Sequence, residues 1–149
     1  MSALDEFADG EQIFASAERH FGISMRSDSG STHDSRLRHY SHMIAAWAAG
    51  NGIIDGREGV DEFRSSIRDW LHDLREPGKP GRNTLAFTSA GTIAMVLCEI
   101  LGLKSDYLPN FAGVLYNASV TEIVYTPSRI TLRTFNVSSH LPRDLLTLV

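Results

Sequence analysis

Cysteine is nearly absent from this sequence, since Cys98 is the single one in 149 residues. One cysteine cannot form an internal disulfide, and its position inside an apolar segment indicates a small buried thiol rather than a reactive one. Basic residues are also scarce, with 14 Lys and Arg against 18 Asp and Glu and a net charge of -4. Because no run or stripe of Lys and Arg occurs, the sequence indicates no nucleic-acid partner.

Long apolar runs are missing as well. No segment is apolar for the roughly 20 residues that cross a membrane, and Met1 is followed by Asp5, Glu6 and Asp9 rather than by a basic and apolar leader. We therefore expect a cytoplasmic protein with no membrane partner. The length and the 42% hydrophobic content are typical of one soluble domain with its own core.

Metal-ligating residues are too dispersed to predict a site. His39 and His42 lie three residues apart in a predicted helix, but no cysteine stands near them and His33 falls in a predicted loop. A zinc site would need a fuller set of ligands. We expect neither a metal nor another cofactor.

Three amphipathic helices are predicted in the first half of the chain, over residues 9–21, 36–49 and 60–74. Each has apolar residues at helical spacing, and Asp9 is a suitable N-cap for the first. Residues 23–35 between the first two helices are rich in Ser, Asp and Gly, which predicts a mobile loop.

The stretch Asn83–Leu103 is the centre of the sequence. Residues 84–88 are an apolar run of strand formers, residues 89–91 are a small-residue turn, and residues 92–101 are apolar almost all round. A strand that leads into a helix through a tight turn is typical of a parallel α/β sheet.

The turn in this stretch is a candidate anion-binding site. The first N–H groups of a helix have no intrahelical acceptor, and they carry the positive end of the helix dipole. Ser89, Ala90 and Gly91 are therefore candidate substrate-binding residues.

A β-hairpin is predicted near the C-terminus. After a connector over residues 103–115 that contains Pro109, residues 119–125 and 130–135 alternate between the two faces of a strand. The residues 126–129 between them form the turn.

Several motifs follow one another in the second half of the chain. They are the helix at 60–74, a proline-glycine link, NTLAFTSAGTI from Asn83, an apolar helix ending in LGL at Leu103, NASVTEIVY from Asn117, and FNxxxHL from Phe135. Their order over residues 60–141 resembles the C-terminal half of the histidine phosphatase superfamily, which has the phosphoglycerate-mutase-like fold. The segment Leu4-Asp5-Glu6-Phe7 resembles the family's L-x-E segment. The resemblance implies a single, partial α/β domain over residues 1–149. Its expected architecture is a three-layer α/β/α sandwich that is incomplete at the N-terminus and carries a C-terminal β-hairpin.

The resemblance also implies a phosphomonoesterase or phosphomutase. In that family a histidine in an R-H-G turn attacks phosphorus, arginines and a second histidine hold the phosphoryl oxygens, and a carboxylic acid protonates the leaving oxygen. Here Ser89 takes the place of the second histidine, in the turn with Ala90 and Gly91. Glu6 is the candidate general acid. Arg19-His20-Phe21-Gly22 has one residue too many for an R-H-G turn.

Two interpretations remain open. In the first, translation starts upstream of Met1, and the complete enzyme hydrolyses a phosphorylated small molecule through a phosphohistidine. In the second, the 149 residues are a non-catalytic pseudophosphatase or remnant that binds an anion or a partner. The chain as written favours inactivity. Because a missing central strand would leave a sheet edge uncovered, self-association through that edge is expected.

Overall fold

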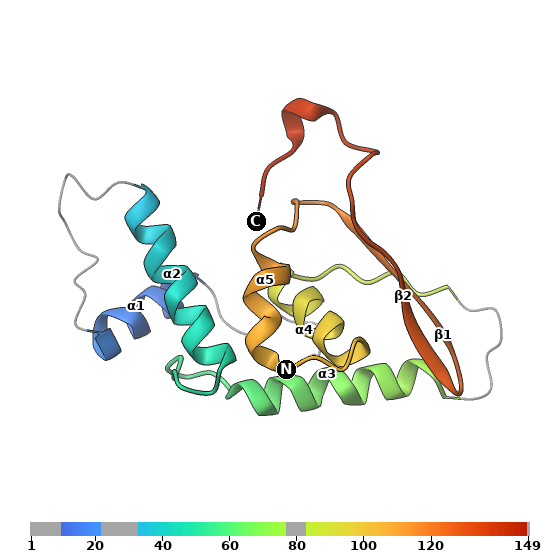
Figure 1. Cartoon of the computed structure of the whole chain (residues 1–149), viewed down its shortest axis with the longest axis horizontal. Coiled ribbons are helices and arrows are strands. Elements are labelled where there is room, and N and C mark those ends of the chain that lie inside the picture. Colours follow the sequence, from blue (N-terminus) through green and yellow to red (C-terminus); the bar gives the residue numbers. More distant parts are fainter. Residues whose placement is uncertain (1–9, 22–32, 77–82, 149) are drawn as a thin grey trace.

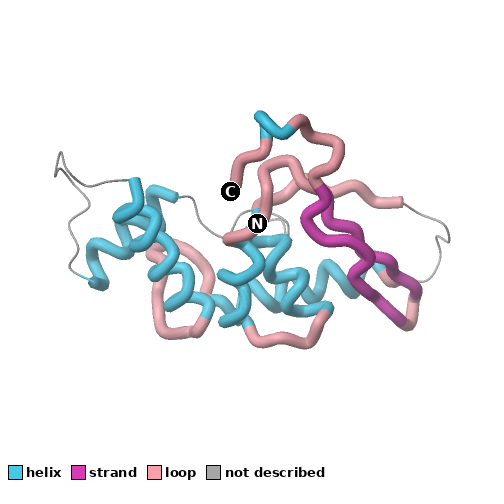
Figure 2. Tube along the Cα trace, turned by 45° about the horizontal axis from the view of Figure 1, so that its top comes forward, coloured by secondary structure: helices cyan, strands magenta, loops and turns pink. Residues whose placement is uncertain are grey.

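The computed structural model describes residues 10–21, 33–76 and 83–148 (Figures 1 and 2). Its elements are helices α1 (Gly10–Phe21), α2 (His33–Ala48), α3 (Val60–Leu74), α4 (Ala90–Ile100) and α5 (Leu108–Ala112), the 3-10 helices η1 (Ser105–Tyr107) and η2 (Arg143–Leu145), and strands β1 (Val120–Thr126) and β2 (Arg129–Val137). In Figure 1, α4 and α5 lie over α3, with α1 and α2 at one end and the hairpin at the other.

The three helices predicted in the first half are confirmed. Their apolar faces point inward, with Ile13 of α1, Trp47 of α2 and Ile67 of α3 almost completely buried. Helix α3 has the predicted bounds, because its apolar residues repeat at three and four positions along the whole segment.

Helix α2 begins earlier than predicted. It includes residues 33–35, so the loop predicted over residues 23–35 is wrong at its end, and residues 22–32 lie outside the described residues.

The core lies between the helices. Trp47 packs against Phe63 with ring centroids 5.9 Å apart, and its indole Nε1 donates a hydrogen bond of 3.2 Å to the carbonyl of Glu58. Helix α4 contacts α3, α5 and β2, and its Met95 and Leu97 have no exposed surface. A helix that is apolar almost all round is stable only when it is covered in this way.

The connector predicted over residues 103–115 is wrong, because the chain forms η1 and α5 there. Pro109 falls in the first turn of α5, where its missing N–H removes no intrahelical hydrogen bond. Leu108 is fully buried, and Phe111 meets Phe135 of β2 edge to face at 6.0 Å. A proline that we interpreted as part of a connector instead begins a helix.

The C-terminal hairpin is confirmed. Strands β1 and β2 are antiparallel, with Ile123 opposite Leu132 and with register shifts on both sides of Glu122. Ile123 packs against the core, whereas Val120 and Val124 on the other face are exposed. This alternation is the period-2 pattern that the sequence showed.

Asn136 joins the hairpin to the loop before it. Its side-chain Oδ1 accepts a hydrogen bond of 2.9 Å from the Tyr116 N–H, and its Nδ2 donates one of 2.7 Å to the Val114 carbonyl. Its backbone has φ 55°, in the left-handed region that asparagine tolerates better than most residues. The amide therefore holds β2 to the loop before β1, beside the register shift between Val120 and Glu122.

The strand predicted at 84–88 is not a strand in the structure. Residues 83–89 form an extended trace that reaches α4 past the hairpin (Figure 1), and within the described residues the sheet contains β1 and β2 alone. A strand needs a neighbouring chain to accept and donate its backbone hydrogen bonds. Apolar sequence alone does not supply that neighbour, so the segment has strand composition without strand pairing.

The described elements make a mixed α/β structure, in agreement with the expected fold class. The three-layer sandwich and its incompleteness at the N-terminus stay predictions. Across the residues that the structure describes, each helix is too short or too polar to span a lipid bilayer.

We predict that Asn136→Ala destabilises the fold by about 1–3 kcal/mol, because two backbone groups lose their side-chain partner and alanine adopts φ > 0 less readily. Urea unfolding followed by tryptophan fluorescence measures the change. Asn110→Ala, at an exposed position of α5, is the control and should change the free energy of unfolding by less than about 0.5 kcal/mol. Equal effects of the two substitutions would contradict the role of Asn136.

Candidate functional site

The predicted anion-binding turn lies at the start of α4. Ser89 is the N-cap, with extended backbone at φ -86° and ψ 166°, and Ala90 and Gly91 begin the helix. The Ser89 hydroxyl does not cap a backbone N–H and lies 3.3 Å from the hydroxyl of Thr92. Ala90, Gly91 and Thr92 are buried, while Ser89 is half-buried, so Ser89 is the member of the turn that reaches solvent.

The charges in the first turn of α4 differ from those in the first turn of α3. The first turn of α3 contains Asp61 and Glu62, which compensate the positive end of its dipole. The first turn of α4 contains no acidic residue. An anion bound at Ser89 would therefore lie at the positive end of a helix dipole that no carboxylate of the first turn neutralises. The Ser89 hydroxyl could also donate one hydrogen bond to that anion.

Two other residues considered for the phosphatase chemistry cannot be placed relative to this turn. Glu6 lies outside the described residues, and so does the side chain of His20. Arg19 is described, and its guanidinium forms an ion pair with Asp55 at 2.6 Å on the side of α1. Arg19 is therefore engaged in an ion pair within the N-terminal part of the chain.

The described histidine side chains are exposed. His42 lies on α2, and His140 has its Nε2 3.0 Å from the carbonyl of Ala118, which attaches the C-terminal segment to the loop before β1. His72 lies in the last turn of α3, with its Nδ1 3.9 Å from a carboxylate oxygen of Asp73. His39 and His42 were considered as a pair that could share a metal, but the side chain of His39 lies outside the described residues.

One group of described side chains has its ligand atoms close enough together to hold a metal ion. His72, Asp73 and Glu76 offer ligand atoms within 4.8 Å of one another at the C-terminal end of α3. All three are exposed, and exposed acidic groups commonly lie this close without an ion. Sequence reasoning passed over this group, although its three members lie within five residues of one another along the chain.

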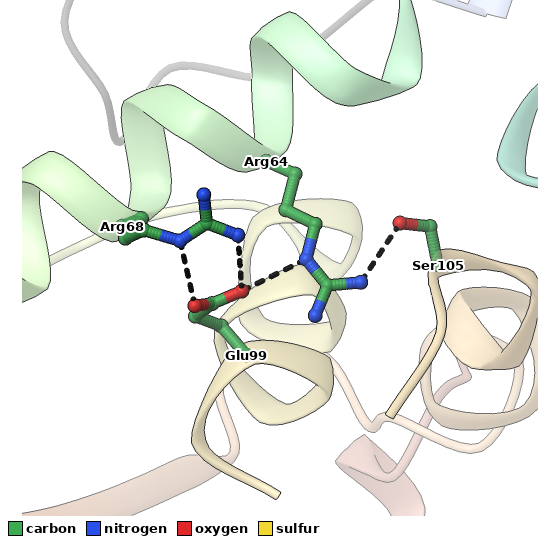
Figure 3. Close-up of polar contacts among 4 residues, drawn as sticks. All are labelled: Arg64, Arg68, Glu99 and Ser105. Carbon is green, nitrogen blue, oxygen red and sulfur yellow. Dashed lines mark hydrogen bonds and ion pairs between the residues drawn. The ribbon is translucent and has the colours of Figure 1, made fainter. Parts of the chain in front are cut away.

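The most enclosed charged cluster joins α3 to α4 (Figure 3). Glu99 Oε2 accepts a hydrogen bond of 2.8 Å from Arg64 Nε, and Glu99 Oε1 accepts one of 2.9 Å from Arg68 Nε. Arg64 also donates from Nη1 to the Ser105 hydroxyl at 3.2 Å. The Glu99 and Arg64 side chains are only 19% and 20% exposed. The two guanidinium groups thus already hold a carboxylate, which makes the cluster a link between helices rather than an open anion site.

The charges in this cluster depend on one another. Hydrogen bonds from Arg68, together with hydrogen bonds and charge from Arg64, lower the pKa of Glu99 despite the opposing effect of burial.

The neighbouring Cys98 is buried, and burial raises the pKa of its thiol, so the expectation of a buried, unreactive cysteine agrees with the structure.

Sequence reasoning missed the Arg64–Glu99 link. Two signals were available, because Arg64 and Arg68 are four residues apart on one side of α3 and Glu99 is the only charged residue within 83–103. A single charge inside an apolar helix generally needs a partner.

We predict that Glu99→Gln lowers the free energy of unfolding at neutral pH by about 1–3 kcal/mol, because hydrogen bonds to a charged acceptor are lost and Arg64 keeps its charge in a half-buried site. The difference should be complete above the ordinary glutamate pKa of about 4.3. It should disappear as the pH falls through the lower pKa of the folded state. Urea unfolding at about pH 7, 5 and 3.5 measures it.

Glu122→Gln is the matched control for Glu99→Gln. Glu122 forms an ion pair with Arg133 at 3.0 Å, but the two side chains are 46% and 65% exposed. Such a pair contributes about 0–1 kcal/mol. If Glu99→Gln costs no more than Glu122→Gln at neutral pH, the cluster does not stabilise the contact of α3 with α4.

Comparison with known protein families matches residues 17–138 to the histidine phosphatase superfamily (branch 1). A search of curated proteins found no match, and neither did a search of solved structures. The matched region runs from α1 through the end of β2 and includes the turn at Ser89. It covers most of the chain and agrees with the motifs that the sequence presented in order. The chain belongs to the histidine phosphatase superfamily.

Proposed function

We propose that these 149 residues form a histidine-phosphatase-family domain that binds an anion at the start of α4 and does not hydrolyse phosphate esters alone. A complete member of the family would hydrolyse a phosphate monoester through a phosphohistidine. The observation that carries the proposal is the turn at Ser89, where a serine precedes a helix whose first turn has no acidic residue.

The residues of this chain lack the groups that hydrolysis would need. Attack on phosphorus needs a nucleophile, and a neutral imidazole positioned in an R-H-G turn supplies it in this family. The given sequence contains no R-H-G tripeptide. At the second histidine position Ser89 can donate a hydrogen bond, but it cannot supply the positive charge of an imidazolium.

Anion binding is argued from the groups that remain. The Ser89 hydroxyl and the N–H groups of Ala90 and Gly91 stand at the N-terminus of an 11-residue helix. Oriented N–H groups and the helix dipole favour a phosphate or another oxyanion at such a position. The ligand we propose is a phosphorylated small molecule.

The alternative function is that of an active phosphatase, in which residues beyond the 149 given supply the nucleophile and the second phosphate-binding arginine. Glu6 would then be the general acid, and residues 84–88 would be paired in a three-layer α/β/α sandwich. Membership of the family favours this alternative. For both candidate functions, the single partial domain and the cytoplasmic location stay predictions.

We predict that the 149-residue chain releases no phosphate from an aryl phosphate above background, because its sequence contains no R-H-G histidine to form the phosphohistidine. Release of the chromogenic phenol measures the rate, with an active histidine phosphatase as the positive control. His20→Ala is the matched variant, and it should leave the background unchanged. Turnover that disappeared in His20→Ala would show that Arg19-His20-Phe21-Gly22 carries the nucleophile.

We also predict that inorganic phosphate binds at the α4 turn. In a titration followed by amide NMR, the N–H signals of Ala90 and Gly91 should shift in a saturable way, because these groups would donate to the anion. The N–H signals of Asp61 and Glu62 are the control, since those carboxylates repel an anion from the start of α3. Equal shifts at both helices, or none at either, would contradict the anion site.

A further inference from the structure

Asn51-Gly52, in the link between α2 and α3, is the one Asn-Gly dipeptide of the chain. The backbone nitrogen of a residue can attack the side-chain carbonyl carbon of an asparagine that precedes it. Glycine hinders this attack least, because it has no Cβ. The sequence therefore singles out Asn51. The other asparagines are followed by residues that carry a Cβ, namely Thr84, Phe111, Ala118 and Val137.

The structure leaves both reacting groups available. Asn51 is exposed, and within the described residues neither its carboxamide nor the N–H of Gly52 makes a hydrogen bond. Two other asparagines differ in this respect. Asn117 Nδ2 donates to the Thr147 hydroxyl at 3.0 Å, and Asn136 Nδ2 donates to a backbone carbonyl at 2.7 Å. Their carboxamides are held in place, whereas that of Asn51 is free to turn toward the backbone of Gly52.

Packing fixes the glycine in this dipeptide. A Cβ atom at position 52 would lie 2.9 Å from the backbone nitrogen of Trp47 and 3.1 Å from the carbonyl carbon of Ala46. Both neighbours are backbone atoms in the last turn of α2, so they cannot move aside as a flexible side chain can. The fold therefore requires glycine at position 52, and the asparagine before it acquires a reactive neighbour.

We propose that Asn51 is a site of spontaneous deamidation that yields aspartate and isoaspartate. The Gly52 nitrogen forms a bond with Cγ of Asn51, the Cγ–Nδ2 bond breaks, and ammonia leaves with the proton of the Gly52 N–H. The product is a cyclic imide. Water then opens the ring at either carbonyl carbon. One opening gives aspartate, and the other gives isoaspartate, in which the backbone runs through the side-chain carbon. Water is the only co-reactant.

Both products alter the end of α2. The Gly50 N–H donates to the Trp47 carbonyl at 2.9 Å, and Gly50 has φ 75°. The Asn51 N–H donates to the Ala46 carbonyl at 2.8 Å. These two bonds form a Schellman motif, which satisfies carbonyls at a helix C-terminus. Isoaspartate lengthens the backbone between positions 51 and 52, so it displaces Gly52 from its close contact with α2.

Aspartate acts through its charge, because it places a negative group at the negative end of the helix dipole. The residue next to this helix end is Trp47, which is 1% exposed and belongs to the core. Deamidation at Asn51 therefore destabilises the fold through the last turn of α2.

Incubation of the 149-residue chain at about pH 8 and 37 °C, followed by proteolysis and mass spectrometry of the peptides, tests the proposal. Conversion at Asn51 should be at least about tenfold faster than at any other asparagine. Asn51→Gln should slow conversion at this position at least about tenfold, because the longer side chain has one more rotatable bond to order. Asn83→Gln, at another exposed asparagine, is the matched control and should leave conversion at Asn51 unchanged.

Urea unfolding followed by tryptophan fluorescence measures the consequence for stability. The urea midpoint of the incubated chain should fall as the converted fraction rises, whereas that of incubated Asn51→Gln should stay constant. Freshly purified Asn51→Asp separates the two products, because it has the added charge without the longer backbone. Its midpoint should lie between those of the fresh chain and the fully converted chain.

A chain in which Asn51 stays intact throughout the incubation overturns the proposal. Conversion at Asn51 that is no faster than at Asn83 also overturns it, because the glycine and the free carboxamide would then have no effect. A urea midpoint that is unchanged after complete conversion contradicts the predicted effect on α2.

Discussion

Burial of α4 is the constraint on which the rest of this structure depends. The helix is apolar almost all round, and Ala94, Met95, Leu97 and Cys98 have no exposed surface. Burying side chains of this kind contributes about 1.5–3 kcal/mol each for the larger ones. The helix contacts α3, α5 and β2. These three elements are held together because each of them packs against α4.

The same constraint explains where charge is allowed. Glu99 is the one charged residue of α4, and it points to α3, where Arg64 and Arg68 meet it. A carboxylate on a buried helix would be costly without such partners. The two arginines therefore stabilise the packing of α3 against α4. In a phosphatase family, an arginine pair could otherwise be interpreted as binding the phosphate of the substrate. The contacts around Glu99, rather than residue type, decide between the two roles.

Family membership and catalytic competence are separate properties of this chain. The match to the histidine phosphatase superfamily extends over residues 17–138, whereas chemistry depends on a few side chains held in one place. In this chain the turn before α4 is built, but it presents Ser89.

The sequence by itself determined helices α1 to α4 and the hairpin, because periods of 3.6 and 2 are properties of local order along the chain. Small residues before an apolar run also predicted a helix start, but α4 begins at Ala90, so Ala90 and Gly91 belong to the helix and not to the predicted turn. Three features depended on tertiary structure. Pro109 begins α5 because Leu108 and Phe111 find a core to pack against. Glu99 acquires its role from residues more than thirty positions away. Residues 84–88 have the composition of a strand but no ladder, because strand pairing belongs to two segments and no single segment contains the information for it.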